Sequence, residues 1–87
     1  MNKNKQKVLQ RLKIVEGQVR GLQEMLSKDV YCIDIITQTS AVKQALSSVE
    51  DTLMENHLKT CAMDQIQKGK ALKAQAEILK VYKLKRK

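Results

Sequence analysis

The sequence contains no proline, no tryptophan and no phenylalanine, and it has only three glycines among its 87 residues. Strands need turns between them, and turns are built mainly from proline and glycine, so this scarcity argues against a β fold. Because only two tyrosines supply aromatic rings, the hydrophobic core must be almost entirely aliphatic. We therefore predict an all-α protein in which residues 1–87 form a single helical domain.

The chain also lacks the length for a large core. A domain of this size buries a modest share of its surface when it folds, and many such domains gain stability by associating. We therefore expect this chain to form oligomers.

Long apolar runs are absent as well. None is long enough to cross a bilayer, and none follows the polar N-terminus as it would in a signal peptide. We expect a cytoplasmic protein. Thiols stay reduced in the cytoplasm, so Cys32 and Cys61 are expected to be ligands, reactive thiols or buried residues rather than a disulfide.

Positive charge, by contrast, is abundant: 17 Lys and Arg residues against nine Asp and Glu residues give a net charge of +8. Five of the basic residues precede the first acidic residue, Glu16. The segment from Lys68 to Lys87 contains eight basic residues and a single acidic residue, Glu77. Charge concentrated at both ends predicts a polyanionic partner, nucleic acid in the first place and an anionic membrane surface in the second. The alternative is a solvated basic surface that only aids solubility.

Apolar residues recur with helical periodicity in two long stretches. In residues 4–27 they form a heptad seam made of Val8, Leu12, Val15, Val19, Leu22 and Leu26. From about residue 30 to residue 60 or beyond, the seam is Ile35, Val42, Leu46, Val49 and Leu53. The polar residues 27–29 separate these two predicted helices. A third helix is predicted over residues 65–82 with Asp64 as its N-cap, although Gly69 is unfavourable within it.

Gly17 and Gly21 lie four residues apart in the first predicted helix, off its apolar seam. Glycine lowers helix stability, so the pair suggests that another backbone approaches the helix there. The alternative is that both glycines are merely tolerated.

The only histidine, His57, precedes Cys61 by four residues, so both side chains are expected on one face of a helix. Cys32 precedes His57 by 25 residues, close to seven full turns, and therefore lies on the same flank. Within one straight helix, however, roughly 37 Å would separate Cys32 from His57. Two antiparallel copies related by an axis near residue 45 would bring Cys32 of one chain level with His57 and Cys61 of the other.

Two thiolates and one imidazole form a soft ligand set. Structural zinc sites have four ligands, and the sequence offers no obvious fourth, whereas Cu(I) accepts three soft ligands. We interpret Cys32, His57 and Cys61 as a three-ligand soft-metal site shared between two chains. The alternative is a helical histidine beside two buried or reactive cysteines.

The segment RLKIVEGQVRG, residues 11–21, resembles the signature of the CsoR/RcnR/FrmR family of bacterial repressors, and the resemblance continues through Tyr31-Cys32, His57 and Cys61 over nearly the whole chain. It implies a three-helix protomer with one long central helix and no winged helix or helix-turn-helix. Protomers of this family form antiparallel dimers that pair into a disc-shaped tetramer. They bind operator DNA without metal and release it when the inducer binds.

The spacing Cys-x24-His-x3-Cys is similar to that of the copper-sensing members of the family. Nickel/cobalt members have a histidine in place of the second thiol, formaldehyde sensors lack that thiol, and persulfide sensors lack the histidine, so the presence of all three residues implies Cu(I). The resemblance also implies that Tyr31 and Glu77 form an outer shell that links metal to DNA affinity. A hydrogen bond from the non-coordinating nitrogen of His57 toward that shell would orient the ring. Without the resemblance, Tyr31 could equally pack beside Cys32.

Basic residues on the two predicted long helices are the candidates for DNA contact. Arg11 and Lys43 correspond to basic positions implicated in this family, and Arg20 and Lys13 are further candidates on the first helix. Such contacts to phosphates would make binding salt-dependent. The scarcity of aromatic side chains argues against a stacking platform for single-stranded nucleic acid.

These observations together predict a Cu(I)-responsive transcriptional repressor whose partners are operator DNA and further copies of itself, with no membrane partner. Its release from DNA would derepress copper efflux or resistance genes. It is not expected to be an enzyme, because it has no general-base arrangement, phosphate loop or second histidine. One alternative is a repressor of the same family in which Cys32 and Cys61 sense persulfide. From a different class, the alternatives are a non-sensing architectural DNA-binding protein and a copper-storage bundle.

Overall fold

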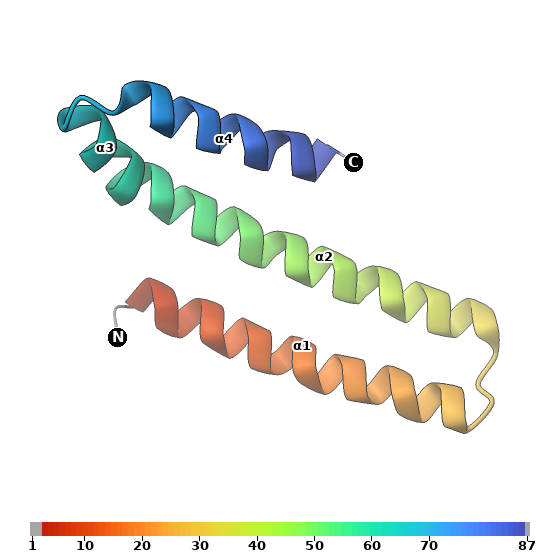
Figure 1. Cartoon of the computed structure of the whole chain (residues 1–87). Coiled ribbons are helices and arrows are strands. Elements are labelled where there is room, and N and C mark those ends of the chain that lie inside the picture. The colour runs from red at the N-terminus through yellow and green to blue at the C-terminus, as the bar shows by residue number, and fades with distance from the viewer. Residues whose placement is uncertain (1–2, 87) are drawn as a thin grey trace. The chain divides into compact units, whose positions relative to one another are not determined.

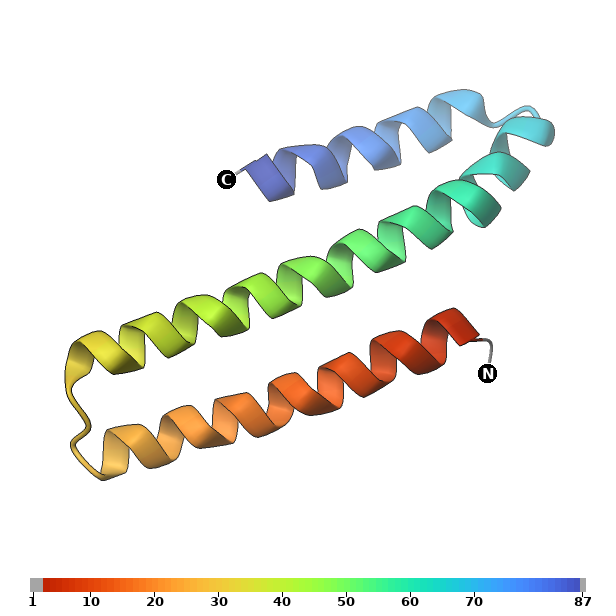
Figure 2. The same ribbon diagram turned by 180° about the vertical axis from the view of Figure 1, so that it is seen from behind.

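The computed structural model describes residues 3–86, and helices account for almost all of them (Figures 1 and 2). In chain order the elements are α1 (Lys3–Ser27), α2 (Cys32–His57), the π-helical turn η1 (Leu58–Ala62), α3 (Met63–Gln67) and α4 (Ala71–Arg86). No strand occurs within this range. The prediction of an all-α protein is confirmed.

The second helical path continues beyond residue 60, as the prediction allowed, but the next helix begins later than predicted. α2, η1 and α3 follow one another without a loop, so the path that begins at Cys32 ends only at Gln67. The third helix is present, but its predicted start at about residue 65 with an N-cap at Asp64 is wrong, since residues 65–67 end the preceding path and α4 runs from Ala71 to Arg86. If α2, η1 and α3 are counted as one continuous helix, the described residues form three helices, as expected of the protomer.

The first helix ends where the sequence predicted a break. Asp29 has a positive φ of 55°. The N–H groups of Asp29 and Val30 donate to the carbonyl groups of Leu26 (3.2 Å) and Met25 (3.0 Å). This pattern is a Schellman cap, in which one left-handed residue reverses the chain and satisfies the last carbonyl groups of the helix.

Gly69 forms the same kind of cap after α3, which explains why no helix runs through it. Its φ is +77°, and the N–H groups of Gly69 and Lys70 donate to Ile66 (3.1 Å) and Gln65 (2.7 Å). A left-handed residue ends a helix, so Gly69 separates α3 from α4 instead of weakening a continuous helix.

Gly69→Ala is expected to lower the free energy of unfolding by about 1 kcal/mol, because a Cβ is unfavourable at this φ. A Cβ built there meets no other atom within 4 Å, so the cost is purely one of backbone conformation. Thermal unfolding followed by circular dichroism measures it. Gly69→Asn is the matched control and should cost less, since asparagine tolerates left-handed backbone. An alanine variant as stable as the parent would contradict this explanation.

The chain divides into two compact units, one ending at Leu53 and the other beginning at Met54. In the first unit α1 runs antiparallel to the facing part of α2 (Figures 1 and 2). Its buried side chains are Val8, Val15, Val42 and Val49. These valines are spaced seven residues apart on each helix, so they lie on the face that the heptad pattern predicted.

The second unit is held by small side chains. Ala62 and Ala74 are its buried residues, exposing 2% and 1% of their surface. Alanine allows helix backbones to approach closely, so α4 can lie near α3.

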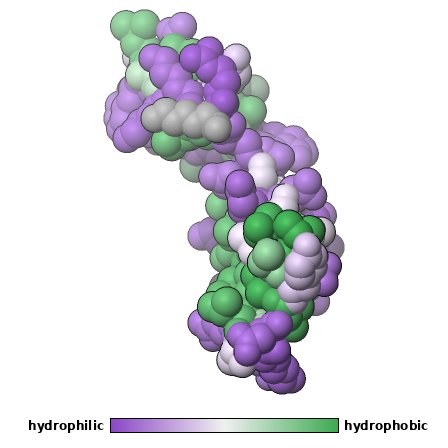
Figure 3. Space-filling view, turned by 90° about the vertical axis from the view of Figure 1, so that its right-hand side faces the viewer, coloured by the Kyte–Doolittle hydropathy of each residue, from purple (hydrophilic) through white to green (hydrophobic). Residues whose placement is uncertain are grey.

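A large part of the predicted seams is uncovered in the single chain. The exposed seam residues are Leu12, Val19, Leu26, Leu46 and Leu53, with between 40% and 68% of their surface accessible. Figure 3 shows such apolar surface open to solvent among hydrophilic side chains. Apolar surface left in water forgoes about 25 cal/mol per Å², so these helices favour association. Among the described helices, none is long and apolar enough to cross a membrane.

Candidate metal centre and nucleic-acid interface

Cys32 is the first residue of α2. The carbonyl of Tyr31 accepts the N–H groups of Asp34 (3.0 Å) and Ile35 (3.3 Å), so Tyr31 lies at the start of the helix and Cys32 opens its first turn. Tyr31 exposes 68% of its surface, and the Cys32 thiol is free and exposed. Both side chains are therefore accessible to another molecule.

His57 and Cys61 lie where α2 ends and the π-helical turn η1 follows it. His57 is the last residue of α2 and is half-buried, whereas Cys61 lies in η1 and is free and exposed. In a π turn hydrogen bonds run from residue i to i+5, so four residues cover slightly less than one turn rather than slightly more. The two side chains thus stay on the same side of the helix, as predicted, although the turn is wider than the α-helix that was expected. Single π turns occur frequently at functional sites.

Thr60 is a neighbour of the Cys61 thiol that sequence reasoning missed. Its Oγ1 lies 3.6 Å from Cys61 Sγ and 2.8 Å from the carbonyl of Asn56. One hydroxyl proton serves one of these acceptors at a time, so Thr60 can donate to the sulfur only by giving up the bond to its own helix.

The described residues of a single chain do not bring a set of metal ligands together. Within residues 3–86 no three His, Cys, Asp or Glu side chains come together as ligands. Cys32 and His57 stand at opposite ends of the 26-residue α2. This agrees with the expectation that Cys32 cannot join His57 and Cys61 within one chain.

Glu77 lies on α4 and is engaged by Gln65 of α3. Gln65 Nε2 donates to Glu77 Oε1 at 2.8 Å. Gln65 follows Cys61 by four residues, so it continues the row that begins at His57. Sequence reasoning missed Gln65, because nothing in a lone glutamine indicates which helix it will contact.

The four basic residues predicted to contact DNA are all placed on the first unit, but in different settings. Lys13 and Lys43 are exposed. Arg20 is paired with Glu16 on its own helix at 3.1 Å. Arg11 is half-buried, and its Nη1 donates to the hydroxyls of Ser48 (3.2 Å) and Thr52 (3.0 Å) on α2.

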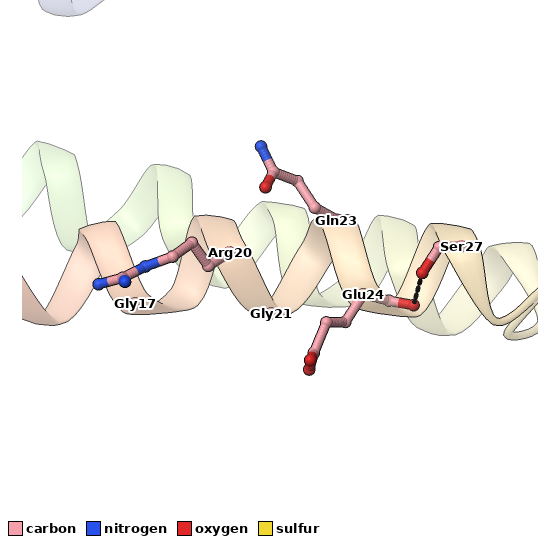
Figure 4. A pocket seen from close by; sticks show the side chains of 6 residues that line it. All are labelled: Gly17, Arg20, Gly21, Gln23, Glu24 and Ser27. Atoms are coloured by element: carbon pink, nitrogen blue, oxygen red, sulfur yellow. Dashed lines mark hydrogen bonds between the residues drawn. The ribbon is translucent and has the colours of Figure 1, made fainter.

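The two glycines of α1 leave its backbone uncovered. An open hollow of about 620 Å³ lies beside them, and its lining residues all come from this helix (Figure 4): Gly17, Arg20, Gly21, Gln23, Glu24 and Ser27. A Cβ built on Gly17 or Gly21 meets no atom within 4 Å. No other described part of the chain therefore approaches this backbone, and an approach by a second molecule stays a prediction.

Comparison with known proteins places these features in context. The sequence profile of the family described as "Metal-sensitive transcriptional repressor" matches residues 4–83. The copper-sensing transcriptional repressor CsoR of Bacillus subtilis is 44% identical over 82 residues, which cover 94% of this chain and 81% of that protein. The copper-sensing transcriptional repressor RicR of Mycobacterium tuberculosis is 49% identical over 59 residues, which cover 68% of this chain and 62% of that protein.

A solved structure is also similar over the whole chain. The crystal structure of the copper-sensing repressor CsoR with Cu(I) from Geobacillus thermodenitrificans matches with a TM-score of 0.90 and 38% sequence identity. The match covers 100% of this chain and 92% of that one.

Proposed function

Because the chain belongs to the family of metal-sensitive transcriptional repressors, as residues 11–21 predicted, we propose that it is a Cu(I)-responsive repressor. The metal-free protein binds operator DNA, and binding of Cu(I) releases the operator and derepresses genes of copper efflux or resistance. One observation carries this proposal. His57 and Cys61 lie on one side of a helical path that begins at the exposed, free Cys32, in a chain similar to copper-sensing repressors.

The ligand set consists of Cys32 from one protomer and of His57 and Cys61 from its partner. Two thiolates and one imidazole suit Cu(I), which is soft and accepts three ligands. Both thiols are free and exposed in the protomer, so they are accessible to a second chain.

The protomers form an antiparallel dimer, and two dimers form a disc-shaped tetramer. In such a dimer the same surface of each chain completes the site of the other, so two identical sites form together. The exposed apolar residues of both seams support this assembly, because a partner would remove them from water.

Tyr31 and Glu77 form an outer shell that links the metal to DNA affinity. A metal-bound imidazole usually donates its other ring N–H to a carboxylate, a carbonyl or water, which orients the ring. Glu77 Oε1 already accepts from Gln65, and a carboxylate has further lone pairs for a second donor.

DNA is bound through phosphates by basic residues that include Arg11, Lys13, Arg20 and Lys43. The net charge of +8 supports this assignment. A bacterial repressor acts where the chromosome is, so the protein works in the cytoplasm. We assign it no catalytic role.

Addition of Cu(I) is expected to weaken binding of promoter DNA by about 5- to 150-fold, the usual range of coupling between two sites. Fluorescence anisotropy of a labelled promoter fragment, titrated with protein under anaerobic conditions with and without Cu(I), measures the change. Removal of the metal with a strong Cu(I) chelator should restore tight binding. An affinity that is the same in all three conditions would instead support a non-sensing architectural protein.

A second candidate signal is a sulfur species, because both cysteines are free and exposed. A persulfide or another sulfur oxidant would oxidise Cys32 and Cys61 and cross-link them between protomers. X-ray absorption spectroscopy of the copper-loaded protein distinguishes the two signals. Three-coordinate scattering from two sulfurs and one nitrogen, at sub-micromolar affinity, supports the copper sensor, whereas its absence supports the thiol sensor.

A further inference from the structure

Arg11 is held by two hydroxyl groups of the neighbouring helix. Its Nη1 donates to Ser48 Oγ at 3.2 Å and to Thr52 Oγ1 at 3.0 Å. The Thr52 hydroxyl in turn donates its own proton to the carbonyl of Ser48 at 3.0 Å. Thr52 Oγ1 can therefore only accept from Arg11, and its orientation is set by α2 itself.

Both hydrogen bonds are donated by the same nitrogen of the guanidinium group, Nη1. Nη1 carries two hydrogens, and each has an acceptor on α2. The edge formed by Nη2 and Nε carries the other three hydrogens in a planar fork. A fork of this kind matches two oxygens of a phosphate or a carboxylate.

The printed hydrogen bonds of Arg11 go to neutral groups, because both acceptors are hydroxyl oxygens of α2. Arg11 also lines a cavity of about 250 Å³, whose other lining residues are Ile14, Val15, Gln18, Ala45 and Ser48. None of these lining residues is acidic, and the hydroxyls that orient the guanidinium are neutral and leave its positive charge in place.

We propose that Ser48 and Thr52 are positioning residues that hold Arg11 with its Nη2–Nε edge directed at a backbone phosphate of the operator. An unrestrained arginine side chain loses rotamer freedom when it binds DNA, and this loss costs free energy. The hydrogen bonds to the two hydroxyls already restrict the rotamers of Arg11 in the free protein, so less freedom is lost on binding. The inference rests on the proposed function, since it takes operator DNA as the source of the phosphate.

The test compares the metal-free double variant Ser48→Ala/Thr52→Val with the parent protein by anisotropy on promoter DNA. The Kd is expected to rise by about 3- to 10-fold, the usual effect of having to order one long side chain on binding. The slope of log K against log salt should stay unchanged, because Arg11 still reaches the phosphate. Arg11→Gln, by contrast, should reduce the magnitude of that slope by about 1, the value expected for the loss of one phosphate contact.

The matched control is Thr39→Val/Ser40→Ala, also on α2. The Thr39 hydroxyl donates to the carbonyl of Ile35 at 2.8 Å within its own helix, so this variant removes a similar pair of hydroxyls without touching Arg11. Its operator affinity should equal that of the parent. Circular dichroism and gel filtration of both double variants show whether the fold and assembly are retained.

Combining the substitutions gives the decisive result. In the Arg11→Gln background, Ser48→Ala/Thr52→Val should not change the operator affinity further, because the guanidinium that the two hydroxyls orient is no longer present. An equal loss of affinity with and without Arg11, or a gain of affinity in the double variant, would overturn the inference. Release of the unaltered protein by Cu(I) is measured separately, so a failure here is distinguishable from a failure of the proposed function.

Discussion

Cys32→Ser is expected to lower the affinity for Cu(I) by at least about a hundredfold and to abolish its effect on operator binding. The serine hydroxyl is a hard oxygen donor that Cu(I) binds poorly, and His57 and Cys61 alone form an incomplete site. The metal-free variant should bind promoter DNA within about twofold of the parent, since Cys32 is exposed on the surface. Competition against a chromophoric Cu(I) chelator measures the metal affinity, and anisotropy measures the DNA affinity.

Mixing two defective variants tests whether the site is shared between chains. Cys32→Ser and Cys61→Ser should each lack high-affinity Cu(I) binding when pure. In a mixed antiparallel dimer, one of the two sites combines intact Cys32 with intact His57 and Cys61. If subunits exchange at random from equal amounts, about a quarter of the parental sites should return. No recovery after demonstrated subunit exchange would show that the ligands do not come from two protomers.

His57→Ala is expected to separate metal binding from release of DNA. The two thiolates still bind Cu(I), although more weakly, because thiolates are the softer and stronger ligands of the set. The coupling free energy between metal and DNA should fall from about 1–3 kcal/mol to near zero, since the imidazole that reaches the outer shell is gone. The measurement is the ratio of operator Kd values with saturating Cu(I) and without metal.

Asn56→Ala serves as the matched control for His57→Ala. Asn56 is the adjacent residue of α2 and is likewise half-buried, but it is not among the proposed ligands. It should keep both metal binding and DNA release. If His57→Ala still released the operator normally at saturating Cu(I), the route through Tyr31 and Glu77 would be wrong.

The heptad pattern predicted the valines that α1 and α2 bury, although other residues of both seams are exposed in the single chain. Val8 and Val15 on α1, and Val42 and Val49 on α2, were assigned from spacing alone and are buried. The start of the third helix was predicted wrongly because Gly69 has two possible roles, a weak position within a helix or a left-handed cap after it. The backbone dihedral at one residue decides between these roles, and apolar periodicity carries no information about it.

The sequence by itself determined the helical class, the basic character and the spacing of Cys32, His57 and Cys61, because each depends on residue type and on the regular geometry of one helix. The tertiary structure alone decided that Arg11 contacts Ser48 and Thr52, which are 37 and 41 residues away, and that Gln65 contacts Glu77. Every helix face carries several polar side chains that could pair. Which of them meet depends on how far one helix slides along and turns about its neighbour, and that register is set by the packing of the buried side chains rather than by the pattern along either helix.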